Sequence, residues 1–201
     1  GITPFHELPG VGENLRDHYS PRMRYAIKGR DYTFCERGNG LSLVLEAIKY
    51  LFARKGFMAL STVPLRMYFK TRTGLMTPDA TISFMPYLTE RRKRARVISK
   101  RPGLTMSVNV LRPESRGNIH IKSSSPHDAP HISFNFLSTQ IDKDTLLLAL
   151  RKGRELMSAQ PISDYVEEEI APGTGLETDE EILTWVRNTA ETAYHPVGTC
   201  K

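Results

Sequence analysis

Alternation of apolar and polar residues, repeated in several short segments, is the feature of this 201-residue sequence that most restricts its fold. Such alternation is the period of a half-buried strand, and turn residues at 113–117 and 125–130 separate neighbouring segments. Because short connections favour antiparallel neighbours, we predict a meander. Its segments are ATISFMP (80–86), LTMSVNVLR (104–112), GNIHIKS (117–123) and HISFNF (131–136).

Three helices are predicted around these segments. Residues 41–55 place apolar side chains at spacings of three and four, on one side of a helix. Asp142 is predicted to cap a second helix that runs to about Gln160, and Thr178 with Glu181 forms a capping box for a third. The other two helices are the candidates to cover the apolar face of the meander. The order of elements predicts the α+β class, an antiparallel sheet (meander) covered by helices.

The first part of the chain has a different character. Residues 1–21 are rich in proline, glycine and polar residues and are predicted to form an extended lead-in segment. A strand then begins near Arg22, because Met23 and Ile27 belong to an alternating run. Residues 57–78 are apolar and basic without a clear period, so we predict a loop that lines or covers something.

The net charge of +6 is local rather than general. Seven cations lie within residues 91–101, and without them the balance is 21 − 22 = −1. A solvated loop is the simpler interpretation, because no stacking aromatic residue lies in the run. The alternative is a basic module that holds nucleic acid or an anionic membrane surface.

Two other classes of protein are excluded by composition. Cys35 and Cys200 are the two cysteines, too few for a disulfide framework or an all-cysteine zinc site. No segment approaches the ~20 apolar residues of a membrane span, and no signal peptide is recognisable near Gly1. We therefore expect free thiols and a cytoplasmic location, with peripheral membrane contact as an open alternative.

None of the six histidines forms a helical pair or neighbours a cysteine at metal-ligand spacing, so no metal site is predicted. His120 and His131 belong to the polar side of the meander and are expected at the surface. His195 differs, because it precedes Pro196 in a conformationally restricted turn after a helix. By itself this pattern leaves both a structural and a catalytic role open.

Three separated blocks make this sequence resemble the glucose–methanol–choline (GMC) oxidoreductases, flavoenzymes that oxidise alcohols, and in particular the choline-dehydrogenase-like alcohol dehydrogenases. The order and spacing of the blocks also match, over nearly the whole chain. The blocks are LPGVGENLRDH (8–18), RPESRGNIHIKSSSPHDAPHISFNF (112–136) and AETAYHPVGTCK (190–201). GVGENL within the first block has no preceding strand and no third glycine, and is a weak match to a nucleotide-binding turn.

The resemblance implies a role for the HPVGTC segment. In the family its histidine lies over the flavin and acts on the substrate hydroxyl, so His195 is the expected catalytic base, with Tyr194, Pro196 and Val197 near the FAD cofactor. An imidazole with an ordinary pKa near ~6.5 suits that proton transfer. The expected reaction is oxidation of a primary alcohol to an aldehyde by hydride transfer to the flavin.

The departures from the family pattern also have implications. The glycine motif for ADP and the second catalytic residue of the family are absent from this sequence. We therefore expect residues 1–21 to lead in from a missing FAD-binding domain of the same polypeptide, and 22–201 to form a substrate-binding domain truncated at the active-site motif. Such a chain is expected to be inactive alone and to lack FAD.

The resemblance also bears on the substrate. Choline enzymes of the family are expected to place a carboxylate in the segment that corresponds roughly to 57–78, which here contains Arg66, Lys70 and Arg72 and no acid. These cations disfavour a quaternary ammonium. A neutral or anionic primary alcohol is the expected small-molecule substrate, and nucleic acid is not an expected partner.

Overall fold

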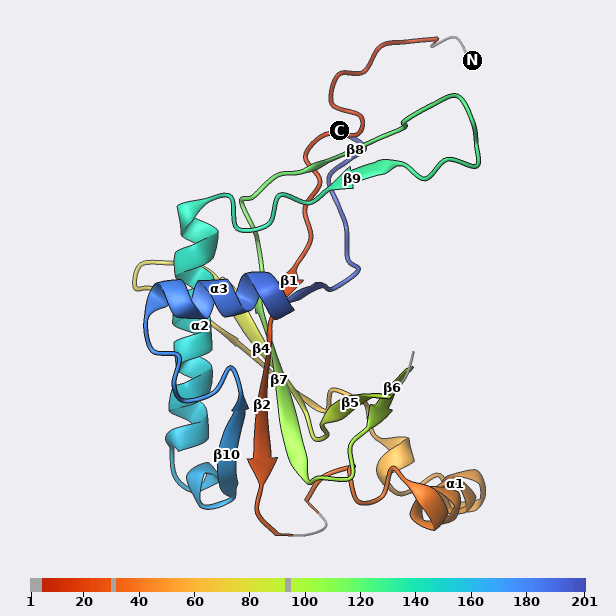
Figure 1. The fold of residues 1–201 in the computed structure, drawn as a ribbon, viewed down its shortest axis with the longest axis vertical. Helices are drawn as coiled ribbons and strands as arrows, with labels where there is room; N and C mark the ends of the chain where they lie inside the picture. The colour runs from red at the N-terminus through yellow and green to blue at the C-terminus, as the bar shows by residue number, and fades with distance from the viewer. Residues whose placement is uncertain (1–4, 30–31, 93–94) are drawn as a thin grey trace.

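The computed structural model describes residues 5–29, 32–92 and 95–201, without the side chains of 90–96. Its centre is a five-stranded sheet in which every neighbouring pair is antiparallel. Helices α2 (Gln140–Ser158) and α3 (Asp179–Thr189) lie together on one side of this sheet (Figure 1). The predicted α+β class is confirmed. In spatial order the strands are β10 (Val166–Ala171), β2 (Arg22–Ile27), β7 (Gly103–Val110), β4 (Ala80–Met85) and β3 (Leu65–Phe69).

The alternation within these strands divides the sheet into an apolar and a polar face. Met23, Ile82 and Met106 are fully buried on the apolar face, which packs against α2 through leucines such as Leu146. Gly153 lets the helix approach closely, because a Cβ there would lie 2.8 Å from the Met23 sulfur. The apolar face is thereby removed from water, whereas the polar face is not covered by α2 or α3.

The meander prediction is wrong in its last two segments. Strands β8 (Asn118–His120) and β9 (His131–Ser133) pair with each other in a separate hairpin that points away from the main sheet (Figure 1). Ile121 is 87 % exposed, so this apolar position does not join the core. Alternation identifies a strand but not the sheet to which it belongs, and here Gly117 bonds to Leu15 instead of continuing the sheet.

Neither edge strand of the main sheet was predicted from the pattern. Strand β3 lies within 57–78, the segment predicted as a loop, and is the edge strand of the sheet. Strand β10 has three consecutive glutamates, which hide the alternation of a strand that forms the opposite edge. The basic run forms the backbone of a hairpin, β5 (Thr89–Arg92) and β6 (Ala95–Ile98), rather than a loop; residues 93–94 lie outside the description.

The predicted helices are present, with one correction to a cap. Thr139, not Asp142, caps α2, since the Thr139 side chain accepts the Asp142 N–H. The Asp142 carboxylate is buried and accepts the backbone N–H groups of Glu114 (2.9 Å) and Ser115 (2.7 Å), so it fixes the turn after β7 instead. The capping box of Thr178 and Glu181 is confirmed, and its hydrogen bonds lower the pKa of Glu181.

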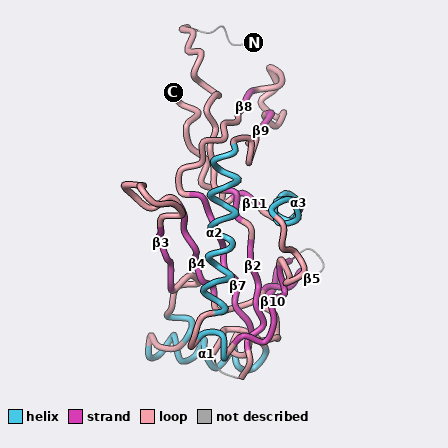
Figure 2. The backbone as a smooth tube through the Cα atoms, turned by 90° about the vertical axis from the view of Figure 1, so that its left-hand side faces the viewer, coloured by secondary structure: helices cyan, strands magenta, loops and turns pink. Residues whose placement is uncertain are grey.

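The remaining elements are short, apart from one helix. Figure 2 shows α1 (Gly40–Ala53) across the lower end of the molecule, below the strands, where it is followed by the 3-10 turn η1 (Phe57–Ala59). A second such turn, η2 (Ile162–Asp164), precedes β10, and β1 (Tyr19–Ser20) pairs with β11 (Glu191–Thr192). Among the described residues, none of the helices combines the length and apolar character that crossing a bilayer requires.

Candidate active site

The three sequence blocks that carry the family resemblance come together at the upper end of the molecule (Figure 1). Residues 11–20 run antiparallel beside 191–200, through β1 and β11 and then through reciprocal 2.9 Å backbone hydrogen bonds between Arg16 and Val197. The second block joins them where Leu15 and Gly117 exchange hydrogen bonds of 2.9 Å. We call residues 11–20 with 191–200 the terminal ribbon.

A glycine in the HPVGTC segment is required for the ribbon to close. Gly198 has φ +98°, a conformation that residues with a Cβ rarely adopt. A Cβ at this position would also lie 2.3 Å from the carbonyl oxygen of Asn14 on the facing segment. The close approach of the two segments therefore depends on this residue type, which explains the glycine physically.

One buried carboxylate holds the turn that contains His195. Asp17 is 5 % exposed, and its Oδ1 accepts the backbone N–H groups of His18 (2.7 Å) and His195 (3.1 Å). Its Oδ2 accepts the hydroxyl of Thr192. Three donors from two segments far apart in sequence thus converge on one side chain, which makes Asp17 a side-chain link between the lead-in segment and the histidine turn.

The imidazole of His195 lies at the surface beside a second imidazole. Its ring meets the His18 ring edge to face, with centroids 5.9 Å apart and planes at 82°. The Nδ1 atom of His18 lies 2.8 Å from the Val110 carbonyl oxygen, so the end of β7 orients His18. His195 itself is exposed, so it is not a histidine packed in the interior.

His195 belongs to the polar side of the sheet. Residues two apart in an extended segment share a side, so His18 lies on the side of Ser20 and Arg22. The Ser20 hydroxyl bonds to Asn109 and the Arg22 guanidinium lies 3.6 Å from Glu191, both on the polar face. Because the His195 ring lies beside the His18 ring, we place the candidate base on this polar side. Helices α2 and α3 lie on the other side of the sheet (Figure 1).

The residues next to His195 are also accessible. Tyr194 is 79 % exposed and has φ +60°, an uncommon conformation for a residue with a side chain. Val197 is 62 % exposed, and Pro196 is exposed as well. All three predicted cofactor neighbours are therefore accessible from solvent.

A row of polar side chains crosses the same face of the sheet. The strand register places four residues side by side, from Arg22 on β2 to Arg66 on edge strand β3. The Nε atom of Arg66 donates a 2.9 Å hydrogen bond to the Ser83 hydroxyl, and its Nη1 lies 3.4 Å from the Tyr68 hydroxyl. This polar row consists of Arg22, Ser107, Ser83 and Arg66.

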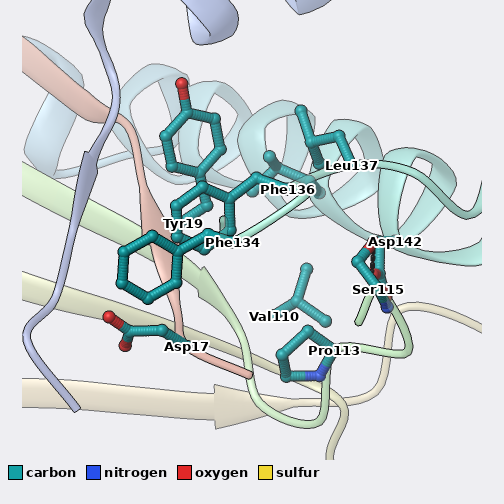
Figure 3. Close-up of a pocket in the computed structure, with 10 residues that line it drawn as sticks. Asp17, Tyr19, Val110, Pro113, Ser115, Phe134, Phe136, Leu137 and Asp142 are labelled. Carbon is teal, nitrogen blue, oxygen red and sulfur yellow. Dashed lines mark hydrogen bonds between the residues drawn. The ribbon is translucent and has the colours of Figure 1, made fainter. Parts of the chain in front are cut away.

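A small cavity lies under the terminal ribbon, on the opposite face of the sheet. It is too small for a substrate, and the side chains around it pack against the ribbon. Figure 3 shows it between Asp17, the aromatic rings of the lead-in segment and β9 region, and Asp142. Its volume is about 20 Å³, room for about one water molecule. The Tyr19 ring stacks on Phe136 at 4.5 Å, so the ribbon is anchored to the segment after β9 by aromatic packing.

The predicted site residues His195, Tyr194, Pro196 and Val197 are all exposed, and their roles stay predictions. Asp17 and His18, which contact the histidine turn, were not singled out from the sequence. The available signal was their place in the block LPGVGENLRDH, the segment that pairs with HPVGTC. His120 and His131 are exposed as expected, and among the described residues no metal-binding cluster is found.

Comparisons with known proteins agree with this arrangement. Residues 113–201 match the family model described as GMC oxidoreductase. The whole chain is 34 % identical to an oxygen-dependent choline dehydrogenase from Photobacterium profundum, covering 35 % of that protein, and 34 % identical to an alcohol dehydrogenase [acceptor] from Pseudomonas putida, covering 36 %. The chain therefore spans about a third of these relatives.

A solved structure shares the fold. A formate oxidase matches 99 % of this chain with a TM-score of 0.83 and 20 % identity, and the match covers 39 % of that protein. These matches are to oxidoreductases, and they do not favour the alternative of a basic module for nucleic acid or an anionic membrane surface.

Proposed function

The chain belongs to the GMC oxidoreductase family, and from that premise we propose that it forms the substrate-binding part of an FAD-dependent enzyme that oxidises a primary alcohol to an aldehyde, with His195 as base. In this proposal residues 1–21 lead in from an FAD-binding region of the same polypeptide, and residues 22–201 bind the substrate. Below, the FAD-loaded enzyme means that longer polypeptide with its cofactor.

The placement of His195 is the observation that carries the proposal. Its imidazole is exposed on the uncovered polar face, and Asp17 fixes the turn from which it projects. A base must lie within hydrogen-bonding reach of the proton that it takes, on a surface that the substrate can approach. A histidine that lies at an open face, in a turn held by a buried carboxylate, meets both the condition of reach and the condition of access.

In this proposal each residue around His195 has a separate role in alcohol oxidation. His195 takes the hydroxyl proton, which makes the carbinol carbon a better hydride donor. FAD, when bound, supplies the acceptor for that hydride. Tyr194, Pro196 and Val197 are the residues that would hold the cofactor, and His18 limits the orientations open to the His195 ring.

The polar row indicates the class of alcohol. Arg66 lies at its outer end, exposed and oriented by Ser83, so a guanidinium with free donors faces the uncovered side. Arg72, by contrast, is paired with Asp79 at 3.6 Å. A cation in this row repels a quaternary ammonium and attracts a carboxylate. We therefore infer a neutral or anionic primary alcohol rather than choline.

A panel of alcohols tests the proposed reaction. The FAD-loaded enzyme is mixed without oxygen with neutral primary alcohols, hydroxy acids that carry a primary alcohol, and choline, the substrate in the name of one relative. We expect bleaching of the flavin absorbance by the first two classes and much slower bleaching by choline. Fastest bleaching by choline would overturn the substrate class, and no bleaching by any alcohol would overturn the reaction.

Arg66→Gln tests the role of the polar row. A charge-assisted hydrogen bond to a substrate carboxylate contributes about 1.5–3 kcal/mol, so kcat/KM for the hydroxy acids is expected to fall about 10- to 100-fold. The value for neutral alcohols is expected to stay within about twofold. Lys122→Gln, an exposed cation beyond β8, is the matched control. Equal losses for both substrate classes would contradict a role in recognising charge.

A further inference from the structure

Arg16 lies between two other segments in the terminal ribbon. Its backbone exchanges hydrogen bonds of 2.9 Å with Val197, and the preceding residue, Leu15, exchanges them with Gly117 on the other side. Directly opposed residues of antiparallel segments project their side chains to the same side. The side chains of Arg16 and Val197 therefore share a side, and the antiparallel register continued by one residue brings Arg116 opposite Arg16.

Arg16 also shares this side with the histidine pair. Leu15 is 4 % and Asp17 is 5 % exposed. Arg16 and His18, which alternate with them, are partly exposed. Residues two apart in an extended segment project to the same side, and the ring of His18 lies beside the ring of His195. A cation therefore lies on the same side of the terminal ribbon as the candidate base.

The charge of Arg16 is not neutralised within the described part of the chain, where no group forms an ion pair or a side-chain hydrogen bond with its guanidinium. Its charged neighbour is another cation. Loss of solvent contact and then the charge of Arg16 lower the pKa of Arg116, and the carboxylates of Asp142 and Glu114 act in the opposite direction. An anion beside Arg16 would relieve the repulsion between the two guanidinium groups.

The two arginines differ in how firmly they are held. The Nη1 atom of Arg116 donates hydrogen bonds to the carbonyl oxygens of Pro113 at 3.0 Å and of Glu114 at 2.5 Å. These contacts tie the Arg116 side chain to its own turn. The Arg16 guanidinium keeps all of its donors for a partner outside the described residues.

The proposed reaction creates a negative charge that such a cation can stabilise. Val197, the neighbour of Arg16, is one of the residues that would hold FAD. Hydride transfer to a neutral flavin ring brings two electrons and one proton, so the ring gains one negative charge, while the hydroxyl proton passes to His195. A fixed cation near the ring favours the charged, reduced form over the neutral, oxidised form.

We propose that Arg16 stabilises the negative charge that the flavin gains on reduction, with Arg116 as a weaker second cation, and thereby raises the reduction potential of the enzyme. This inference rests on the proposed function, because it requires FAD beside Val197. Arg16 acts on the cofactor, whereas Arg66 is assigned to the carboxylate of the substrate, so different measurements report on the two arginines.

The midpoint potential of the FAD-loaded enzyme tests this role. Reduction by dithionite, in equilibrium with a dye of known potential, needs no alcohol substrate. Arg16→Gln is expected to lower the equilibrium constant for reduction about tenfold, which is about 30 mV for a two-electron couple. Arg16→Lys keeps the positive charge and is expected to recover most of this loss. Arg116→Gln is expected to lower the potential by less than Arg16→Gln.

Arg151→Gln is the matched control. Arg151 is an exposed cation of α2, on the other side of the sheet, where it bonds to Asp179 at 2.6 Å. Its replacement is expected to leave the potential unchanged. An unchanged potential for Arg16→Gln with FAD bound, or an equal fall for Arg151→Gln, would overturn the proposal. Lower stability or weaker FAD binding at an unchanged potential would also overturn it, since Arg16 would then pair with a carboxylate elsewhere in the polypeptide or with a cofactor phosphate.

The same measurement separates this inference from the proposed function. If the potential falls in Arg16→Gln but no alcohol bleaches the flavin, the role of Arg16 stands and the proposed reaction fails. If alcohols bleach the flavin but the potential is the same in Arg16→Gln, the proposed reaction stands and the role of Arg16 fails.

Discussion

His195→Ala is expected to slow reduction of the flavin by an alcohol about 10²- to 10⁴-fold while FAD remains bound. The side chain is exposed and its backbone N–H, rather than its ring, bonds to Asp17, so the turn keeps its shape when the imidazole is removed. The alcohol then keeps its proton as hydride leaves, which raises the barrier. Anaerobic stopped-flow absorbance measures the rate directly.

A second histidine variant makes this result specific. His131→Ala removes an exposed imidazole from β9, outside the terminal ribbon, and is expected to leave the reduction rate within about twofold. A reduction rate for His195→Ala close to that of the unchanged enzyme, with FAD still bound, would remove His195 from the mechanism. In that case the neighbouring His18 ring would be the next residue to test.

Asp17→Ala is expected to damage both stability and the rate of flavin reduction. The change leaves three converging donors without their acceptor in a buried position, at a cost of about 3 kcal/mol in the free energy of unfolding. The histidine turn also loses its side-chain link to the lead-in segment, although the backbone hydrogen bonds between Arg16 and Val197 remain, so kcat is expected to fall at least about tenfold. Urea unfolding and steady-state kinetics measure the two effects.

Asp17→Asn distinguishes positioning from loss of folding. An asparagine carbonyl oxygen in the place of Oδ1 accepts the same two N–H groups, from His18 and His195, and its amide donates to the Thr192 hydroxyl. This variant is expected to recover most of the stability and kcat that alanine loses. Equal damage by asparagine and alanine would show that the negative charge, rather than the hydrogen-bond geometry, matters.

The sequence predicted the elements that depend on local chemistry. The capping box at Thr178 and the apolar spacing in 41–55 correspond to real helices, because capping and helical period are properties of neighbouring residues. The same spacing does not tell what the apolar side of α1 packs against, and no residue of this helix is buried in the structure. Tertiary contacts leave no periodic signal.

The candidate site was predicted through a motif and completed through topology. His195 was found in the HPVGTC block, but neither its neighbour His18 nor its anchor Asp17 follows from spacing, since 177 and 178 residues separate them from it. Only the pairing of the lead-in segment with the C-terminal segment brings them together. Arg66 was likewise assigned to a loop, and the strand register reveals that it ends a row of polar residues.

A crystal structure of the FAD-loaded enzyme with a bound, unreactive analogue of its alcohol substrate tests the central claim most directly. The account predicts that the analogue's oxygen lies about 3 Å from an imidazole nitrogen of His195, on the polar face of the sheet. An analogue whose oxygen bonds to a different side chain, with the His195 ring turned away, would contradict the assignment of the base.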